Sequence, residues 1–406
     1  MLKGFKYRLY PTDSQAELLN KHIGSCRFVY NLALECKQIA YAGNKVSLTC
    51  FDLIKQLPDL KKECEWLKEI NSQSLQQSIV HMDIAFNRFF KGTADFPAFK
   101  KKGLKQSFAV PQNILIAGNK LVIPKFKDGI EIVLHRPYTG TIRQATISKT
   151  PTGKYFVSLL IETNDTIPTK APITEASTIG VDLGLKSFIV GSNGEPFDNP
   201  KFLRKSLAKL KYTSRKYSKY KGKRTRKELA VLHEKVANQR KDFLHQTSTR
   251  LIRENQSIAI ENLNIKGMTA KCKPVQDETG RYLPNGQSRK SGLNRSITDA
   301  GWGTFVTMLE YKAEWYGRNI LRIGRFDPSS KTCNVCGSIN KELTLADRVW
   351  KCSDCGTVLD RDVNAAINIK TFALKKHLSA EHRLENRNEL PTLVGVLTSE
   401  APIPLG

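Results

Sequence analysis

The C-terminal part of the chain holds two closely spaced cysteine motifs, Cys333-Asn334-Val335-Cys336-Gly337 and Trp350-Lys351-Cys352-Ser353-Asp354-Cys355-Gly356. Two Cys-x-x-Cys pairs at this distance match the four-cysteine zinc pattern. Each pair bends through a glycine-terminated knuckle, so that Cys333, Cys336, Cys352 and Cys355 can surround one ion as a tetrahedron. Four thiolates leave no position for water, and the predicted Zn²⁺ is therefore structural. The alternatives are a redox pair and a chance pattern.

Acidic residues at three separate places in the sequence form a second candidate site. Asp182 ends a short apolar strand, Glu261 follows the apolar run Ile258-Ala259-Ile260, and Asp360-Arg361-Asp362 precedes a helix start at Val363-Asn364-Ala365-Ala366. Carboxylates at the ends of adjacent strands, with one from a neighbouring helix, can converge on two divalent cations about 3.5–4 Å apart. Such hard oxygen ligands select Mg²⁺ or Mn²⁺.

Each acid also has an ordinary structural interpretation. Asp182 before Leu183-Gly184 can be a turn residue, and Glu261 can pair with a lysine. Asp360 or Asp362 can cap a helix N-terminus, a position that aspartate favours. The prediction of a catalytic metal site therefore depends on all three settings together.

Charge and composition restrict the partner. The chain has 406 residues with 65 Lys plus Arg against 38 Asp plus Glu, a formal net charge of +27. Such a field attracts polyanions and predicts a nucleic-acid partner, the alternatives being a solubility device or a ribosome-associated structural protein. No apolar run approaches the roughly 20 residues that cross a bilayer. The basic start lacks the apolar stretch of a signal peptide, so we expect a cytoplasmic protein that makes no membrane contact.

The hydrophobic pattern divides the chain into segments. Residues 12–92 are mainly helical by period, with Thr12 and Gln15 as a capping-box pair. Short β-like runs over 93–163, joined by the strand at 1–11, predict a small barrel or sandwich into which the helical block is inserted. Residues 164–176 are expected to be a linker. The segment 373–406 shows little pattern and is expected to be disordered.

Two basic segments are candidate nucleic-acid contacts. The run from Lys201 to Lys227 interleaves cations with Tyr212, Tyr217 and Tyr220, as a phosphate-tracking surface with stacking rings does. Its alternative is a solvated helix face. The predicted contacts are Lys205, Arg215, Lys216, Lys219 and Arg224, with Lys100, Lys101 and Lys102 as a second, less specific cluster.

Taken together, these motifs resemble the TnpB (OrfB) family of bacterial insertion sequences, which is related to type V CRISPR effectors. The resemblance is carried by Gly180-Val181-Asp182-Leu183-Gly184, Ile260-Glu261-Asn262-Leu263, Leu309-Glu310-Tyr311-Lys312-Ala313, Pro328-Ser329-Ser330-Lys331-Thr332-Cys333, Asp360-Arg361-Asp362-Val363-Asn364-Ala365-Ala366 and the N-terminal Tyr10-Pro11-Thr12. It extends to about residue 372.

The resemblance implies a multidomain α+β protein. Its expected parts are a wedge-like β-barrel (1–11 and 93–163), a helical recognition insertion (12–92), a RuvC-like, RNase H-type nuclease domain (177–330 and 359–372) and an inserted zinc ribbon (331–358). It implies that Asp182, Glu261 and Asp362 are the metal-binding catalytic triad. Asp362 is preferred to Asp360 because it is nearer the Asn-Ala-Ala helix in the motif.

The resemblance also implies partners. Family members bind an RNA transcribed from the transposon end and cut double-stranded DNA that pairs with this guide, beside a short flanking motif. Gln76 lies where a residue that reads this motif is expected. Two alternatives are a nuclease-inactive, RNA-guided DNA-binding regulator and a transposase that acts directly on transposon ends. The regulator would lack a triad acid, whereas this sequence has all three, and no HUH motif is apparent for the transposase.

Overall fold

The computed structural model describes residues 1–344 and 346–388, and its contacts divide the chain into two units. Unit 1 comprises Met1–Thr166 with Arg215–Val231, and unit 2 comprises Ile167–Ser214 with the chain from Leu232 on. The division near residue 166 falls within the predicted linker, where residues 164–176 form neither helix nor strand. No helix in the described ranges is long and apolar enough to cross a membrane.

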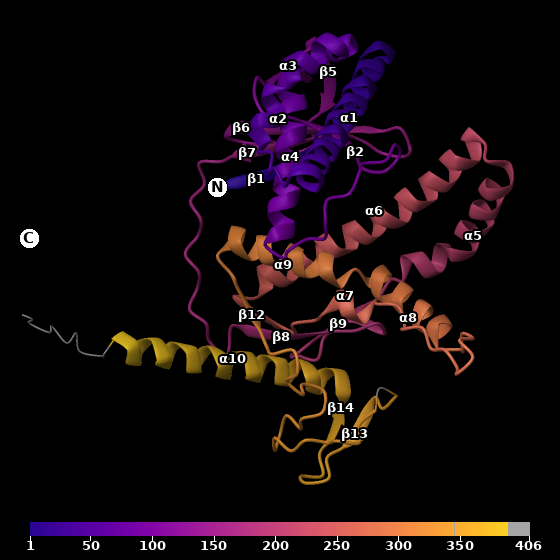
Figure 1. Ribbon diagram of the computed structural model, residues 1–406. Helices are drawn as coiled ribbons and strands as arrows, with labels where there is room; N and C mark the ends of the chain where they lie inside the picture. Colours follow the sequence, from indigo (N-terminus) through magenta and orange to yellow (C-terminus); the bar gives the residue numbers. More distant parts are fainter. Residues whose placement is uncertain (345, 389–406) are drawn as a thin grey trace, which may run out of the picture. The chain divides into compact units, whose positions relative to one another are not determined.

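Unit 1 is built on an antiparallel sheet of seven strands in the order β2-β6-β7-β1-β5-β4-β3 (Figure 1). The edge strands β2 and β3 do not pair with each other in the described part of the chain, so closure into a barrel stays a prediction. The strands are β1 (Leu2–Tyr10), β2 (Gln106–Val110), β3 (Leu115–Ala117), β4 (Lys120–Ile123), β5 (Phe126–Val133), β6 (Thr141–Lys149) and β7 (Tyr155–Glu162).

A helical block separates β1 from β2 in the sequence, as the helical periodicity predicts. It comprises α1 (Asp13–Asn44), α2 (Cys50–Lys55), α3 (Leu57–Glu63), the 3-10 turn η1 (Glu65–Glu69) and α4 (Ser72–Phe90). The predicted capping box is confirmed: the Gln15 N–H donates to Thr12 Oγ1, and the Thr12 N–H donates to Gln15 Oε1. It satisfies two backbone donors that an α-helix leaves free at its start.

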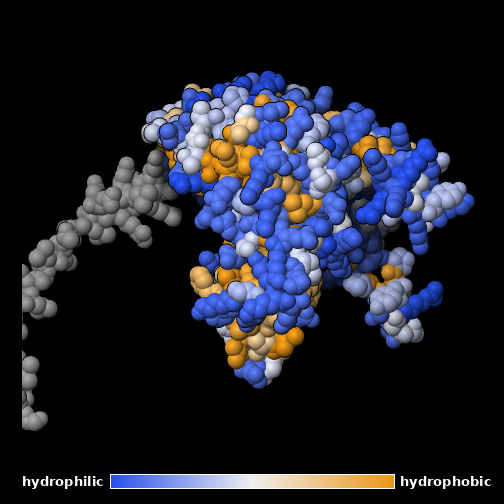
Figure 2. All heavy atoms as spheres, turned by 90° about the horizontal axis from the view of Figure 1, so that it is seen from above, coloured by the Kyte–Doolittle hydropathy of each residue, from blue (hydrophilic) through white to orange (hydrophobic). Residues whose placement is uncertain are grey.

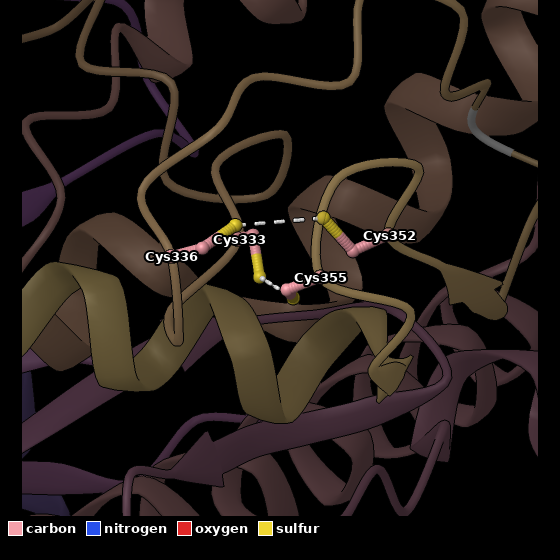
Figure 3. Close-up of side chains that lie close together, drawn as sticks. All are labelled: Cys333, Cys336, Cys352 and Cys355. Atoms are coloured by element: carbon pink, nitrogen blue, oxygen red, sulfur yellow. Dashed lines mark hydrogen bonds between the residues drawn. The ribbon is translucent and has the colours of Figure 1, made fainter.

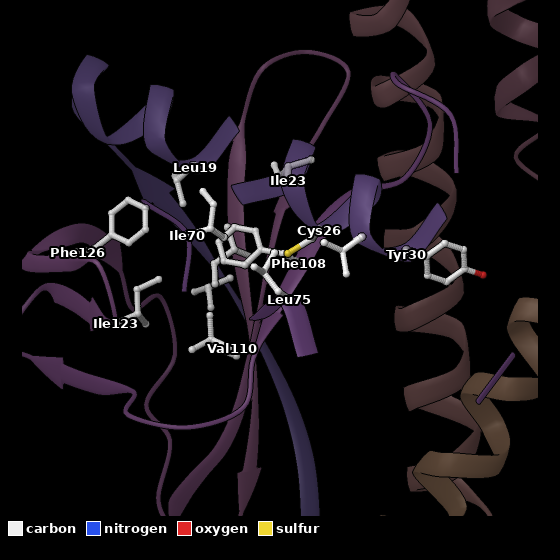
Figure 4. Close-up of a cluster of buried hydrophobic side chains, with 14 of the residues drawn as sticks. Leu19, Ile23, Cys26, Tyr30, Ile70, Leu75, Phe108, Val110, Ile123 and Phe126 are labelled. Atoms are coloured by element: carbon white, nitrogen blue, oxygen red, sulfur yellow. The ribbon is translucent and has the colours of Figure 1, made fainter. Parts of the chain in front are cut away.

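The core of unit 1 lies between these helices and the sheet. Leu19, Ile23 and Cys26 of α1 meet Phe108 and Val110 of β2 in a cluster of buried side chains (Figure 4). Burial of this apolar surface is the main favourable contribution to folding. It also places Cys26 as a small buried hydrophobe, as its scattered position in the sequence predicts.

Unit 2 contains a five-stranded sheet in the order β10-β9-β8-β11-β12. The strands β8, β11 and β12 run parallel to one another, β9 pairs antiparallel with β8, and β10 pairs antiparallel with β9 at the edge. Their bounds are β8 (Thr178–Leu183), β9 (Ser187–Gly191), β10 (Pro196–Asp198), β11 (Ser257–Ile260) and β12 (Asn319–Arg322).

Helices cover both faces of this sheet (Figure 1). Leu244 of α6 and Phe305 of α9 share a buried cluster with Val181 and Ile258, whereas Ile369 of α10 packs with Ala259 in a separate cluster. Ile297 and Ala300 of α8 belong to the same cluster as Leu244 and Phe305. The helices are α5 (Phe202–Tyr220), α6 (Lys223–Glu254), α7 (Ile265–Met268), α8 (Gln287–Ala300), α9 (Trp302–Tyr316) and α10 (Arg361–Asn388).

Two segment boundaries correct the sequence prediction. Residues 215–231, which comprise the end of α5, the short connection and the start of α6, group with unit 1 and not with the segment 177–330 that contains them. A Cβ added to Gly103 would lie 3.3 Å from the Arg226 guanidinium, so residue 226 lies close to the loop around Gly103 within unit 1. Residues 373–388, expected to be disordered, continue α10, because Ala373 is buried beside Ile369. The rest of the expected disordered tail, 389–406, lies outside the described residues.

Candidate active site and zinc site

The four cysteines converge as their spacing predicts (Figure 3). Their sulfur atoms all lie within 4.8 Å of one another, with Cys333 Sγ 3.7 Å from Cys355 Sγ and Cys336 Sγ 3.6 Å from Cys352 Sγ. Four sulfurs bound to zinc at about 2.3 Å are roughly 3.8 Å apart at a tetrahedron's edges. The cluster therefore fits a closed Zn²⁺ site.

Two equivalent knuckles hold the thiols. The Gly337 N–H donates to Cys333 O and the Gly356 N–H to Cys352 O, and both glycines have positive φ values that other residues rarely adopt. A hydrogen bond from Ser338 lowers the pKa of Cys352 to about 6, whereas burial raises the pKa of Cys333 to about 11. The hairpin of β13 (Val349–Lys351) and β14 (Val358–Asp360) joins the second knuckle to α10.

The three predicted catalytic acids all belong to unit 2. Asp182 lies near the carboxyl end of β8, and Glu261 directly follows β11. These strands are parallel neighbours with Val181 opposite Ile260, so the next residues along both strands reach the same sheet edge. Asp362 lies in the first turn of α10, which crosses β8 so closely that a Cβ on Gly180 would be 2.0 Å from Ala366 O.

The negative charges of Glu261 and Asp362 affect the protonation of Asp182. Burial, followed by the negative charges of Glu261 and Asp362, raises the pKa of Asp182 to about 7. Asp182 and Asp362 line one cleft, together with Lys186, Arg348 and Arg361. Glu261 Oε1 accepts a 2.6 Å hydrogen bond from the Ser329 hydroxyl.

This arrangement fits divalent cations. A bound cation would offset the burial and the negative charges that raise the pKa of Asp182, and an all-oxygen donor set suits Mg²⁺ or Mn²⁺. Within the described residues, only the four cysteines bring three or more ligand atoms within 4.8 Å of one another. The three acids are thus spread more widely than the four cysteine sulfurs.

The structure adds residues that the sequence analysis missed. Arg348, in the ribbon, and Arg361, at the start of α10, both lie 3.3 Å from the Asp362 carboxylate. Asp360 caps α10, since its Oδ1 accepts from the N–H groups of Asp362 and Val363. This is the capping alternative that the sequence left open. Arg361 stands inside the quoted motif, but no spacing rule marks Arg348.

Comparisons with known proteins agree with these motifs. Family models match residues 1–45 (helix-turn-helix domain), 158–271 ("Probable transposase" of the OrfB IS605 type) and 302–369 (Cas12f1-like TNB domain). A Streptomyces pristinaespiralis protein named "Putative RNA-guided DNA endonuclease" is 39% identical over 92% of this chain and 89% of its own length. The chain belongs to the TnpB (OrfB) family.

Further relatives agree with the TnpB assignment. An Escherichia coli K12 protein, "Putative RNA-guided DNA endonuclease InsQ", is 31% identical and covers 91% of each chain. A cryo-EM structure of Cas12f1 with sgRNA and target DNA matches at a TM-score of 0.54 and 13% identity, over 88% of this chain and 83% of that one. This likeness establishes a mixed α/β, multidomain fold.

The predicted nucleic-acid contacts of this TnpB chain are not equally available. Lys101, Lys102, Lys205, Arg215 and Lys219 are exposed and form no ion pair within the described residues. By contrast, Lys216 and Arg224 both pair with Glu228, and Lys100 Nζ lies 3.7 Å from the centre of the Tyr30 ring. Gln76 is exposed on α4. Hydrophilic residues cover most of the face shown in Figure 2.

Proposed function

We propose that this chain is an RNA-guided DNA endonuclease of a transposable element, which cuts guide-matched double-stranded DNA beside a short flanking motif. The relatives named as RNA-guided endonucleases support the general activity. The observation that carries the proposal is the parallel register of β8 and β11, which brings Asp182 and Glu261 to one end of the sheet, with Asp362 in the first turn of α10, which packs on β8. The raised pKa of Asp182, caused by burial and by the charges of Glu261 and Asp362, agrees with this grouping. Two carboxylates at the ends of neighbouring parallel strands, with a third from an adjoining helix, are typical of a phosphoryl-transfer site.

The chain's own side chains have separate roles in this proposal. Asp182, Glu261 and Asp362 would hold two Mg²⁺ or Mn²⁺ ions, which when bound activate a water molecule and stabilise the leaving oxygen. Asp182 must lose its proton to act as a ligand. Arg348 and Arg361, beside Asp362, would direct positive charge at the scissile phosphate.

Recognition is divided between the protein and its RNA. Base pairing with the guide supplies sequence specificity, and the protein supplies backbone contacts and reads the flanking motif. The exposed cations Lys205, Arg215 and Lys219 would contact phosphates, and Gln76 would read a base of the flanking motif. The Zn²⁺ of the ribbon would keep the segment around Arg348 folded.

The test uses the purified protein loaded with RNA from its own locus. Guide-matched DNA with a randomised flank is incubated with Mg²⁺ or with EDTA. We expect cutting only with Mg²⁺, next to one enriched flank, and at least a hundredfold loss in Asp182→Ala. Undiminished cutting by that variant would disprove the triad, and guide-dependent binding without cutting would favour the regulator.

A further inference from the structure

A row of buried hydrogen bonds connects the zinc ribbon with the sheet edge. Asn364 and Asn368 lie one turn apart on α10, where their side chains share one face of the helix. Both are almost fully buried, with exposures of 1% and 3%. Buried amides at such positions are retained only when their hydrogen bonds are satisfied.

The two amides bind the segment 328–332 that leads into the first knuckle. Asn368 Nδ2 donates to Ser329 O at 2.8 Å and to Thr332 O at 2.6 Å. Asn364 Nδ2 donates to Thr332 O at 2.8 Å, and its Oδ1 accepts from the Asn334 N–H at 3.0 Å. Asn334 lies between Cys333 and Cys336, so the row begins inside the zinc-binding loop.

The same segment reaches the catalytic acid. Ser329 is 4% exposed, and its hydroxyl donates to Glu261 Oε1 at 2.6 Å. At 2.6 Å this hydrogen bond is at the short end of the range for a hydroxyl donor. Glu261 itself follows the end of β11 and is half-buried, and no other hydrogen bond to its carboxylate occurs within the described residues.

We propose that Ser329, Asn364 and Asn368 are positioning residues that fix the Glu261 carboxylate relative to the ribbon. The zinc ribbon and the cation site are then coupled, because the ribbon's first knuckle and Glu261 are held by one buried network. The inference rests on the proposed function for the role of Glu261 as a metal ligand. Groups that orient metal ligands typically change metal affinity by about 10–100-fold when removed.

The test measures Mn²⁺ binding to the whole protein without nucleic acid, by electron paramagnetic resonance. We expect Ser329→Ala to bind Mn²⁺ roughly tenfold more weakly, with unchanged zinc content and melting temperature, and Ser329→Thr to restore binding. Asn368→Ala should weaken binding in the same direction. Thr371→Ala is the matched control, because among the described residues the Thr371 hydroxyl donates to Ile367 O of the same helix alone.

A Glu261→Gln variant separates the two possible failures. If Glu261→Gln loses Mn²⁺ affinity while Ser329→Ala keeps that of the parent, the positioning role is wrong and the metal site stands. If Glu261→Gln also binds as the parent does, the proposed function itself is wrong. Parental affinity in Asn368→Ala, together with weakened Ser329→Ala, would overturn the part assigned to the asparagines.

Discussion

Arg348 donates from Nη1 to both carboxylate oxygens of Asp362, at 3.3 Å each, although Arg348 lies in the zinc ribbon and Asp362 on α10. The ribbon therefore contributes a cation to the cleft that contains Asp182 and Asp362. The segment that carries the cysteine cluster thus also contacts a predicted catalytic acid.

Replacing Arg348 by alanine should slow DNA cleavage by roughly tenfold or more, because a positive charge aimed at the phosphate is lost. RNA affinity should not change. Cleavage rates at saturating Mg²⁺ measure the effect. The control is Lys351→Ala, an exposed cation of the same ribbon. Equal rates for Arg348→Ala and the parent would show that Arg348 is only an ion-pair partner of Asp362.

Gly180→Ala should destabilise the protein by about 3 kcal/mol, since the added Cβ would lie 2.0 Å from Ala366 O and push α10 from β8. It should also displace Asp362. The control is Gly24→Ala in α1, where an added Cβ meets no atom within 4 Å and should stabilise the helix by about 0.5–1 kcal/mol. Denaturant unfolding measures both changes. Parental stability in Gly180→Ala would contradict the close crossing.

Zinc content should be near one ion per chain in the parent and near zero in Cys352→Ser, because three thiolates hold the ion far more weakly than four. Cys272→Ser, a cysteine outside the cluster, is the control and should keep its zinc. Elemental analysis of the folded protein measures this. A folded parent without zinc would refute the ribbon assignment.

The pH dependence of stability should report on Lys312. Its Nζ donates to His245 O, Ser248 Oγ and Thr249 Oγ1, and burial lowers its pKa to about 8. In the unfolded chain its pKa is about 10.4, so between about pH 8 and 10 the unfolded state binds more protons. This group therefore makes the unfolding free energy rise with pH across that window, by about 1–3 kcal/mol.

Lys312→Met should lack this rise, because methionine fills similar space without a titrating group. Unfolding free energies of the parent and of Lys312→Met at pH 7.5 and pH 10 measure it. Subtracting the two pH dependences removes the contribution of all other groups. Identical pH dependences in the two proteins would rule out the lowered pKa.

Among the cations of α5, the exposed Arg215 and Lys219 should contribute more to RNA affinity than Lys216, which forms an ion pair. Arg215→Ala combined with Lys219→Ala should reduce the slope of log affinity against log salt by about 2, one for each lost phosphate contact. Lys216→Ala should change the slope less, since Lys216 already pairs with Glu228 at 3.1 Å. Equal slopes in the double variant and the parent would remove this helix from the RNA interface.

The sequence predicted the parts that follow local rules. The two Cys-x-x-Cys spacings predicted that the sulfur atoms of Cys333, Cys336, Cys352 and Cys355 would converge. The apolar runs before Asp182 and Glu261 predicted two strand ends. These strands pair in parallel, which places both acids at one edge.

Long-range contacts were beyond such rules. Arg348 reaches Asp362 only through the fold of the ribbon, and Ser329 reaches Glu261 across 68 residues. Asp360 and Asp362 could not be separated as cap and ligand by spacing, because both precede the same helix. The helix through 373–388 was missed because a helix can extend from a packed segment although its own sequence lacks a strong pattern.

The most direct test of the central claim is anomalous diffraction from crystals of the RNA-bound protein soaked in Mn²⁺. We predict Mn²⁺ peaks bridging the carboxylates of Asp182, Glu261 and Asp362, and their loss in crystals of Asp182→Asn. Mn²⁺ found only on the RNA, with the three carboxylates free of metal, would contradict the account.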